Sequence, residues 1–156
     1  MRRGWKIGAI VALAIARAPA VFAQSAPGPV GRWLSEAKDG VIDIYSCGDK
    51  LCGKLVWIRD PLDKNGKPQV DDKNPDSHLR SRPRCGMVML GGFVRKGTNE
   101  WGDGWIYDPA SGKTYSAKMR LDGANVLKLR GFVGISLFGE TQDWTRADPK
   151  LENCGP

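Results

Sequence analysis

The stretch Thr114–Val133, with the sequence TYSAKMRLDGANVLKLRGFV, sets the fold class of this chain. Apolar and polar side chains alternate along Thr114–Leu121, and the same alternation returns around Leu127 and Leu129. The residues between the two runs, Asp122–Asn125, have the composition of a tight turn. A period of two places one face of each strand in a core and the other in water, as antiparallel sheets allow. The stretch therefore predicts an antiparallel β-hairpin.

Outside this hairpin, the chain continues as short strand-like runs separated by turn signals such as Asp108–Lys113. The segment Asn74–Arg80 predicts a short helix, with Asn74 as its cap and Pro75 at its first position. Seven or eight short strands with one short helix indicate an all-β sandwich or barrel. The further strands are expected at Val41–Tyr45, Gly53–Arg59, Met87–Phe93, Trp101–Tyr107 and Glu140–Arg146, with Gly31–Leu34 as a candidate eighth.

The first 23 residues predict a signal peptide. Arg2, Arg3 and Lys6 form a basic start, an uncharged apolar run follows at Ile7–Ala16, and small residues lead to a cleavage position after Ala23. The apolar run is shorter than the roughly 20 residues that span a bilayer, so a permanent membrane anchor is not expected. Residues 24–30 are then a flexible start, residues 31–156 form one domain, and the location is periplasmic or secreted.

The net charge argues against a nucleic-acid partner. Four of the 24 basic residues and none of the 17 acidic ones lie in residues 1–23, so cleavage lowers the net charge from +7 to +3. Both signs are interspersed along the remainder. Long-range attraction for nucleic acid needs a clustered surface of one sign, which this pattern does not offer.

Four cysteines in an exported chain predict disulfide bonds. Cys47 and Cys52 flank a turn, which favours a local bridge, and Cys85 would then pair with Cys154. The alternative is a zinc site, but no C-x-x-C pair is present and His78 is the only histidine. We expect disulfides, no metal and no cofactor.

Two groups of motifs resemble known families. Gly31-Arg32-Trp33 and Trp144-Thr145-Arg146 resemble the lipocalin-like (calycin) signature, in which an early tryptophan closes one end of a barrel and a late arginine covers its indole. This resemblance implies structural roles for Trp33 and Arg146. A more extensive resemblance is to a bacterial exported family catalogued as domain of unknown function 2147. Its segments are Asp43–Gly48, Leu51–Lys54, Leu79–Pro83 with Cys85-Gly86, Tyr107–Pro109, Gly112–Tyr115 and Leu129–Gly134.

What the resemblance implies is an antiparallel up-and-down β-barrel of the lipocalin type, exported to the periplasm or beyond. It implies no reaction, and the residues do not supply one. His78 lies in a polar segment, and no serine stands in a G-x-S-x-G elbow. The run Asp63–Lys67 is partly like a calcium loop but lacks the downstream glutamate. The chain is therefore not expected to be an enzyme.

Two sets of side chains are candidates for binding. Arg80, Arg82 and Arg84 either clamp an acidic group or pair with the nearby Asp71, Asp72 and Asp76. Aromatic residues on the expected strands either line a cavity or fill the core. These residues are Trp57, Trp101, Trp105, Tyr107 and Tyr115.

The leading hypothesis is an exported, non-enzymatic binding protein that holds a small amphipathic or lipid-like ligand in the barrel. Trp57, Trp105, Tyr107 and Tyr115 would bury the apolar part, and Arg80, Arg82 or Arg130 would anchor an acidic head group. The alternative is an interaction module that binds an envelope protein or the cell surface, with a filled barrel as its scaffold.

Overall fold

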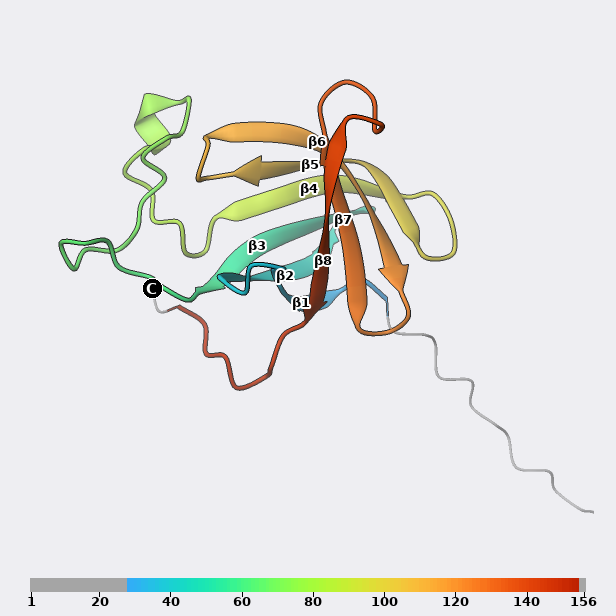
Figure 1. Cartoon of the computed structure of the whole chain (residues 1–156), viewed down its shortest axis with the longest axis horizontal. Coiled ribbons are helices and arrows are strands. Elements are labelled where there is room, and N and C mark those ends of the chain that lie inside the picture. Colours follow the sequence, from blue (N-terminus) through green and yellow to red (C-terminus); the bar gives the residue numbers. More distant parts are fainter. Residues whose placement is uncertain (1–27, 155–156) are drawn as a thin grey trace, which may run out of the picture.

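The structure is a computed structural model that describes residues 28–154, and it shows a closed barrel of eight antiparallel strands (Figure 1). Each strand pairs with the next in sequence, and the last pairs with the first. The strands are β1 (Gly31–Leu34), β2 (Gly40–Cys47), β3 (Lys50–Ile58), β4 (Val88–Arg95), β5 (Glu100–Asp108), β6 (Lys113–Asp122), β7 (Val126–Phe132) and β8 (Gly139–Arg146). The expected signal peptide, at residues 1–23, lies outside the described residues.

All eight strands expected from the sequence are present, with boundaries shifted by a few residues. The prediction of a helix at Asn74–Arg80 was wrong in extent and in its cap. Only a 3-10 turn, η1 (Ser77–Leu79), forms, and Asp76 caps it by accepting a hydrogen bond from the His78 backbone N–H. Asn74 is buried instead, and its side chain contacts Tyr107 on β5, so tertiary contacts replace the expected cap.

One end of the barrel is closed around Trp33, as the lipocalin resemblance implies. The β1–β8 seam has only two paired positions, one of which joins Trp33 to Arg146. The Arg146 guanidinium lies 3.8 Å from the centre of the Trp33 ring. Arg146 also donates hydrogen bonds to the carbonyls of Gly28, Val30 and Ala124, so it joins three segments across this end.

Apolar side chains fill the interior above this end. Phe93 is fully buried, and its ring lies against Gly104 so closely that a Cβ there would come within 2.5 Å of it. The larger members of the interior cluster include Trp33, Ile44, Leu51, Leu90, Phe93, Trp101, Met119, Leu127 and Trp144.

The other end of the barrel, here called the open end, carries the loops 35–39, 59–87, 109–112 and 133–138. Two isolated β-bridges lie within the 59–87 loop and fold it back on itself. They join Leu62 to Pro68 and Val70 to Pro83. A disulfide joins Cys85 near its end to Cys154 in the C-terminal tail, and a second joins Cys47 to Cys52 across the β2–β3 turn. Both bonds are those expected from the sequence.

Candidate functional site

Two adjoining cavities lie at the open end of the barrel. The first has a volume of about 370 Å³, and interior residues of three strands, Ile42, Leu55 and Trp144, form part of its wall. The second has a volume of about 290 Å³, and Tyr115 and Leu129 are among the residues that line it. Both cavities are lined by Ile106, Asp108 and Gln142, so they form one hollow, here called the mouth.

Gln142 is an exposed polar side chain in the wall of the mouth. It pairs across the sheet with the buried Leu129, and paired residues share a face, so Gln142 points inward. Its Oε1 accepts a hydrogen bond of 2.9 Å from Trp144 Nε1. Indole N–H is a donor only, so this contact orients the amide and leaves the Nε2 hydrogens for another acceptor.

The rim of the mouth carries charges of both signs. Arg84 lines the first cavity, but its guanidinium already donates to Gln69, Asp72 and two backbone carbonyls. Arg59 pairs with Asp60 at 3.0 Å, and both side chains are exposed. The charged residues that line the mouth are Asp39, Arg59, Asp60, Arg84, Asp108 and Glu140, so acidic residues outnumber basic ones there.

A buried polar cluster fastens the 59–87 loop beside the mouth. Asp71 is fully buried and accepts hydrogen bonds from Tyr107 at 2.6 Å, Asn74 at 2.7 Å and Arg82 at 2.7 Å. Burial on its own would raise the pKa of Asp71, but these hydrogen bonds outweigh it and hold that pKa below its ordinary value of 3.8. Burial, together with the Asp71 carboxylate, raises the pKa of Tyr107 to about 12.

The predicted aromatic binding residues lie in different places. Tyr107 and Tyr115 line the mouth, one in each cavity. Trp105 is exposed, and its ring lies over Gly91 and Gly92 of β4. Trp57 is half-buried and pairs with Val41 beside a bulge in β2, and it is not among the residues that line the mouth. The structure therefore brings together two of the four.

The predicted arginines lie outside the mouth. Arg80 Nε donates to the Asn74 carbonyl, and Arg82 pairs with Asp71. The alternative in which this arginine group pairs with neighbouring aspartates is thus the one observed, through Asp71 for Arg82 and Asp72 for Arg84. Arg130 lies on the outer face of the barrel, where it donates to Thr141 and to the β7–β8 loop.

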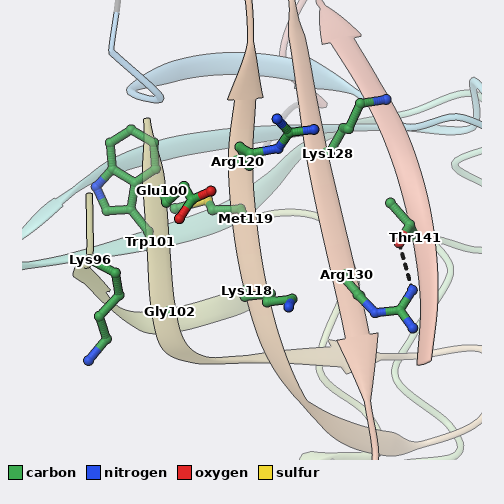
Figure 2. Close-up of a pocket in the computed structure, with 10 residues that line it drawn as sticks. All are labelled: Lys96, Glu100, Trp101, Gly102, Lys118, Met119, Arg120, Lys128, Arg130 and Thr141. Atoms are coloured by element: carbon green, nitrogen blue, oxygen red, sulfur yellow. Dashed lines mark hydrogen bonds between the residues drawn. The ribbon is translucent and has the colours of Figure 1, made fainter. Parts of the chain in front are cut away.

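A groove of about 320 Å³ runs along that outer face (Figure 2). Figure 2 shows basic side chains from β6 and β7 along it, with Glu100 as its one acidic lining residue. The remaining lining residues are Gly102, Thr141, and Trp101 and Met119, which belong to the interior cluster. The groove, here called the basic groove, carries Lys96, Lys118, Arg120, Lys128 and Arg130.

Sequence reasoning missed Gln142 and Ile106. The signal for Gln142 was the alternation of the last strand, which puts residues 140, 142 and 144 on one face. A polar residue two positions before a core tryptophan breaks the apolar face. Ile106 gave no such signal, because apolar residues on a strand are ordinary core.

Within residues 28–154 there is no group of three or more His, Cys, Asp or Glu side chains arranged to hold a metal ion. The same part of the chain contains no helix that is long and apolar enough to cross a membrane.

Comparison with known proteins agrees with the fold. The chain is similar to protein HP1028 from the human pathogen Helicobacter pylori, which is described as belonging to the lipocalin family. The two chains are 19% identical, the match covers 80% of this chain and 86% of the other, and the TM-score is 0.70. At this identity, the similarity shows a shared fold. A search of curated proteins finds no match. The model of a family described as "Uncharacterized protein conserved in bacteria (DUF2147)" matches residues 31–146, and this chain belongs to that family.

Proposed function

We propose that this protein is an exported, non-enzymatic binding protein that holds one small amphipathic molecule in the mouth of its barrel. The proposal rests on the shape and the lining of the mouth. The mouth is concave, apolar side chains form part of its wall, and polar groups converge on it, which are features of a small-molecule site. The larger cavity, about 370 Å³, suits a compact ligand because binding sites range from about 300 to 1,000 Å³.

The walls and the rim indicate the class of ligand. An apolar portion would pack between Leu55, Ile106 and Tyr115, and a polar portion would meet the Gln142 amide hydrogens. The rim carries both signs of charge, and Arg84 is already engaged by the loop. A neutral or zwitterionic polar group therefore suits the mouth better than the strongly acidic head group expected from Arg80, Arg82 and Arg130.

The two disulfides, together with the states of His78 and Tyr107, support an exported protein that is not an enzyme. Two disulfides are typical of an oxidising compartment, in keeping with the signal peptide expected at residues 1–23. His78, the only histidine, lies on the exposed η1 turn and does not line the mouth. Tyr107 stays protonated at neutral pH because its pKa is about 12, so it serves as a donor to Asp71 rather than as a base.

The test is identification of bound molecules by native mass spectrometry and solvent extraction of the protein purified after export. Gly131 offers a matched pair of variants, because a Cβ there would lie 3.6 Å from Ile106 and 3.7 Å from Tyr115, an ordinary contact. We expect Gly131→Ala to keep the bound molecule, and Gly131→Val, which reaches further into the smaller cavity, to lose most of it. Protein that carries no extractable amphiphile, or equal occupancy in both variants, would contradict the proposal.

The alternative, an interaction module on a filled barrel, is favoured by a different observation. The barrel is not filled throughout, because apolar side chains fill its interior toward the closed end, whereas the mouth at the open end is hollow. The loop 133–138, however, exposes several large apolar side chains, as an interaction surface would.

A further inference from the structure

The loop 133–138 between β7 and β8 projects beyond the strands at the open end (Figure 1). It contains four of the nine large apolar side chains that are exposed within residues 28–154. Their exposed fractions run from 59% to 75%, higher than at the other five positions. The four are Val133, Ile135, Leu137 and Phe138. Such side chains concentrated at one tip indicate a surface that is covered in use.

Two basic side chains of the barrel wall, Arg130 and Lys118, hydrogen-bond to this loop. Arg130 donates to the Ser136 carbonyl at 2.7 Å and to the Leu137 carbonyl at 3.2 Å. Lys118 Nζ lies 3.3 Å from the Ser136 hydroxyl, and the Phe138 N–H donates to the Ile135 carbonyl. Several backbone polar groups of the loop are therefore satisfied internally, which lowers the cost of placing the loop in an apolar medium.

The basic groove adjoins the loop, because Lys118 and Arg130, which hydrogen-bond to it, also line the groove. Lys118 pairs with Arg130 in the first row, and Arg120 pairs with Lys128 in the next, about 7 Å further along the strands. Lys128 contacts Asp122 and Asp143, but Arg120 makes no ion pair with any residue in the described part of the chain. Lys96 is likewise paired, with Asp103, so the groove's positive charge rests on Lys118, Arg120 and Arg130, which make no ion pair within the described part of the chain.

We propose that the loop 133–138 inserts its apolar tip into the surface of an anionic lipid bilayer, while the basic groove faces the head groups. Interfacial binding combines a small buried apolar area with attraction between basic side chains and anionic lipid. The protein would lie on the membrane and not span it.

A protein partner fits this surface less well. A stable protein interface buries roughly 800 Å² on each partner, more than four side chains at the tip of a loop provide. The charge distribution also differs from that of a protein interface, whose centre is depleted of charge. The inference does not depend on the ligand, although Val133 and Phe138 also line the mouth, which would then open at the bilayer surface.

The experiment is co-sedimentation of the protein, purified after export, with vesicles of phosphatidylglycerol and phosphatidylethanolamine. Vesicles of phosphatidylcholine alone serve as the uncharged comparison. The test variant is the double substitution Ile135→Ser and Leu137→Ser, because neither residue lines the mouth and both are exposed. We expect it to weaken binding to anionic vesicles at least about tenfold, since interfacial affinity scales with buried apolar area.

Two matched controls separate the tip and the groove from general surface effects. Val30→Ser removes an exposed apolar side chain at the closed end and should leave vesicle binding unchanged. Arg120→Gln should weaken binding to anionic vesicles, whereas Lys50→Gln, a charge loss at the closed end, should not. Circular dichroism and thermal unfolding would show that every variant is folded.

Three results would overturn the inference. The first is equal vesicle binding by wild type and the Ile135→Ser, Leu137→Ser variant. The second is binding that disappears completely in high salt and is insensitive to the apolar substitutions, which would show attraction by charge alone. The third is self-association that the double variant abolishes without any vesicle binding, which would assign the tip to a protein contact. Loss of vesicle binding in a variant that retains its extracted ligand would separate this inference from the proposed function.

Discussion

Asp71 is the residue whose role depends most on its surroundings. In the sequence it is one of several aspartates in a polar segment, yet it is fully buried where the 59–87 loop meets β5. Three side chains satisfy its carboxylate, among them Tyr107 from β5. A buried carboxylate is tolerated only when it is paired and hydrogen-bonded, so this cluster joins the loop to the barrel wall.

The pH dependence of stability follows from the lowered pKa of Asp71. A group whose pKa is lower in the folded state stabilises the fold above its unfolded pKa, and that stabilisation is lost as the pH falls through the folded pKa. We therefore expect Asp71→Asn to lower the free energy of unfolding substantially at pH 7 and by less at about pH 3, which lies below the ordinary pKa of 3.8. Urea unfolding followed by tryptophan fluorescence at both pH values measures this difference.

The control is Asp72→Asn, which removes an exposed carboxylate that pairs with Arg84 in the same loop. Exposed ion pairs contribute at most about 1 kcal/mol, so its effect at pH 7 should be small. An Asp71→Asn penalty of equal size at pH 7 and pH 3 would contradict the role assigned to the carboxylate.

At the scale of elements, the weakest part of the barrel is the seam between its first and last strands. β1 has four residues, and it pairs with β8 at two positions only. Arg146 compensates for this short ladder, since its guanidinium covers the Trp33 ring and donates to three carbonyls. Closure therefore rests on one side chain as much as on backbone pairing.

Replacing Arg146 by lysine tests this dependence. Lysine keeps the charge but lacks the planar fork, so it cannot cover the indole and reach the carbonyls of Gly28, Val30 and Ala124 together. We expect Arg146→Lys to lower the free energy of unfolding by about 2 kcal/mol, as for loss of charged hydrogen bonds. Arg120→Lys is the matched control, and equal losses in the two variants would refute the special role of Arg146.

At the scale of the whole molecule, the open end depends on links between segments that are far apart in sequence. Cys85 and Cys154 are separated by 69 residues, and their bond ties the C-terminal tail to the end of the 59–87 loop. The tail also follows the barrel wall, where the Cys154 N–H donates to the Val56 carbonyl and Arg32 donates to the Leu151 carbonyl. The tail thus links the C-terminal end of the 59–87 loop to the barrel wall.

The two disulfides should contribute unequally to stability. The chain-entropy model gives about 4 kcal/mol for a loop of the length closed by Cys85–Cys154, against about 2 kcal/mol for the short loop closed by Cys47–Cys52. We expect the paired substitution Cys85→Ser with Cys154→Ser to lower the urea midpoint more than Cys47→Ser with Cys52→Ser. It should also open the 59–87 loop to limited proteolysis, and the reverse order in either measurement would contradict this view.

How much of the site could be predicted differs between individual residues. Tyr115 was placed by the alternation of its strand, because a period of two assigns side chains to faces. The same alternation could not show that Trp105 lies outside, since its place over Gly91 and Gly92 depends on a neighbouring strand. The ion-pair partner of Arg82 could not be predicted either, because it depends on whether the fold of the loop places Asp71 beside it.

The local pattern of residues was enough to predict the strands and their antiparallel arrangement, and it favoured the cysteine pairing that the structure shows. The closing tryptophan–arginine contact was implied by the family resemblance. These features follow from backbone geometry, which acts over a few residues, and from motifs that stand in the chain as written. Only the tertiary structure decided which interior positions are filled and which remain hollow at the mouth. It also decided which charges neutralise one another and that the apolar loop 133–138 stands beside a basic groove. The reason is physical: packing and electrostatics depend on distances between segments that the order of residues along the chain does not specify.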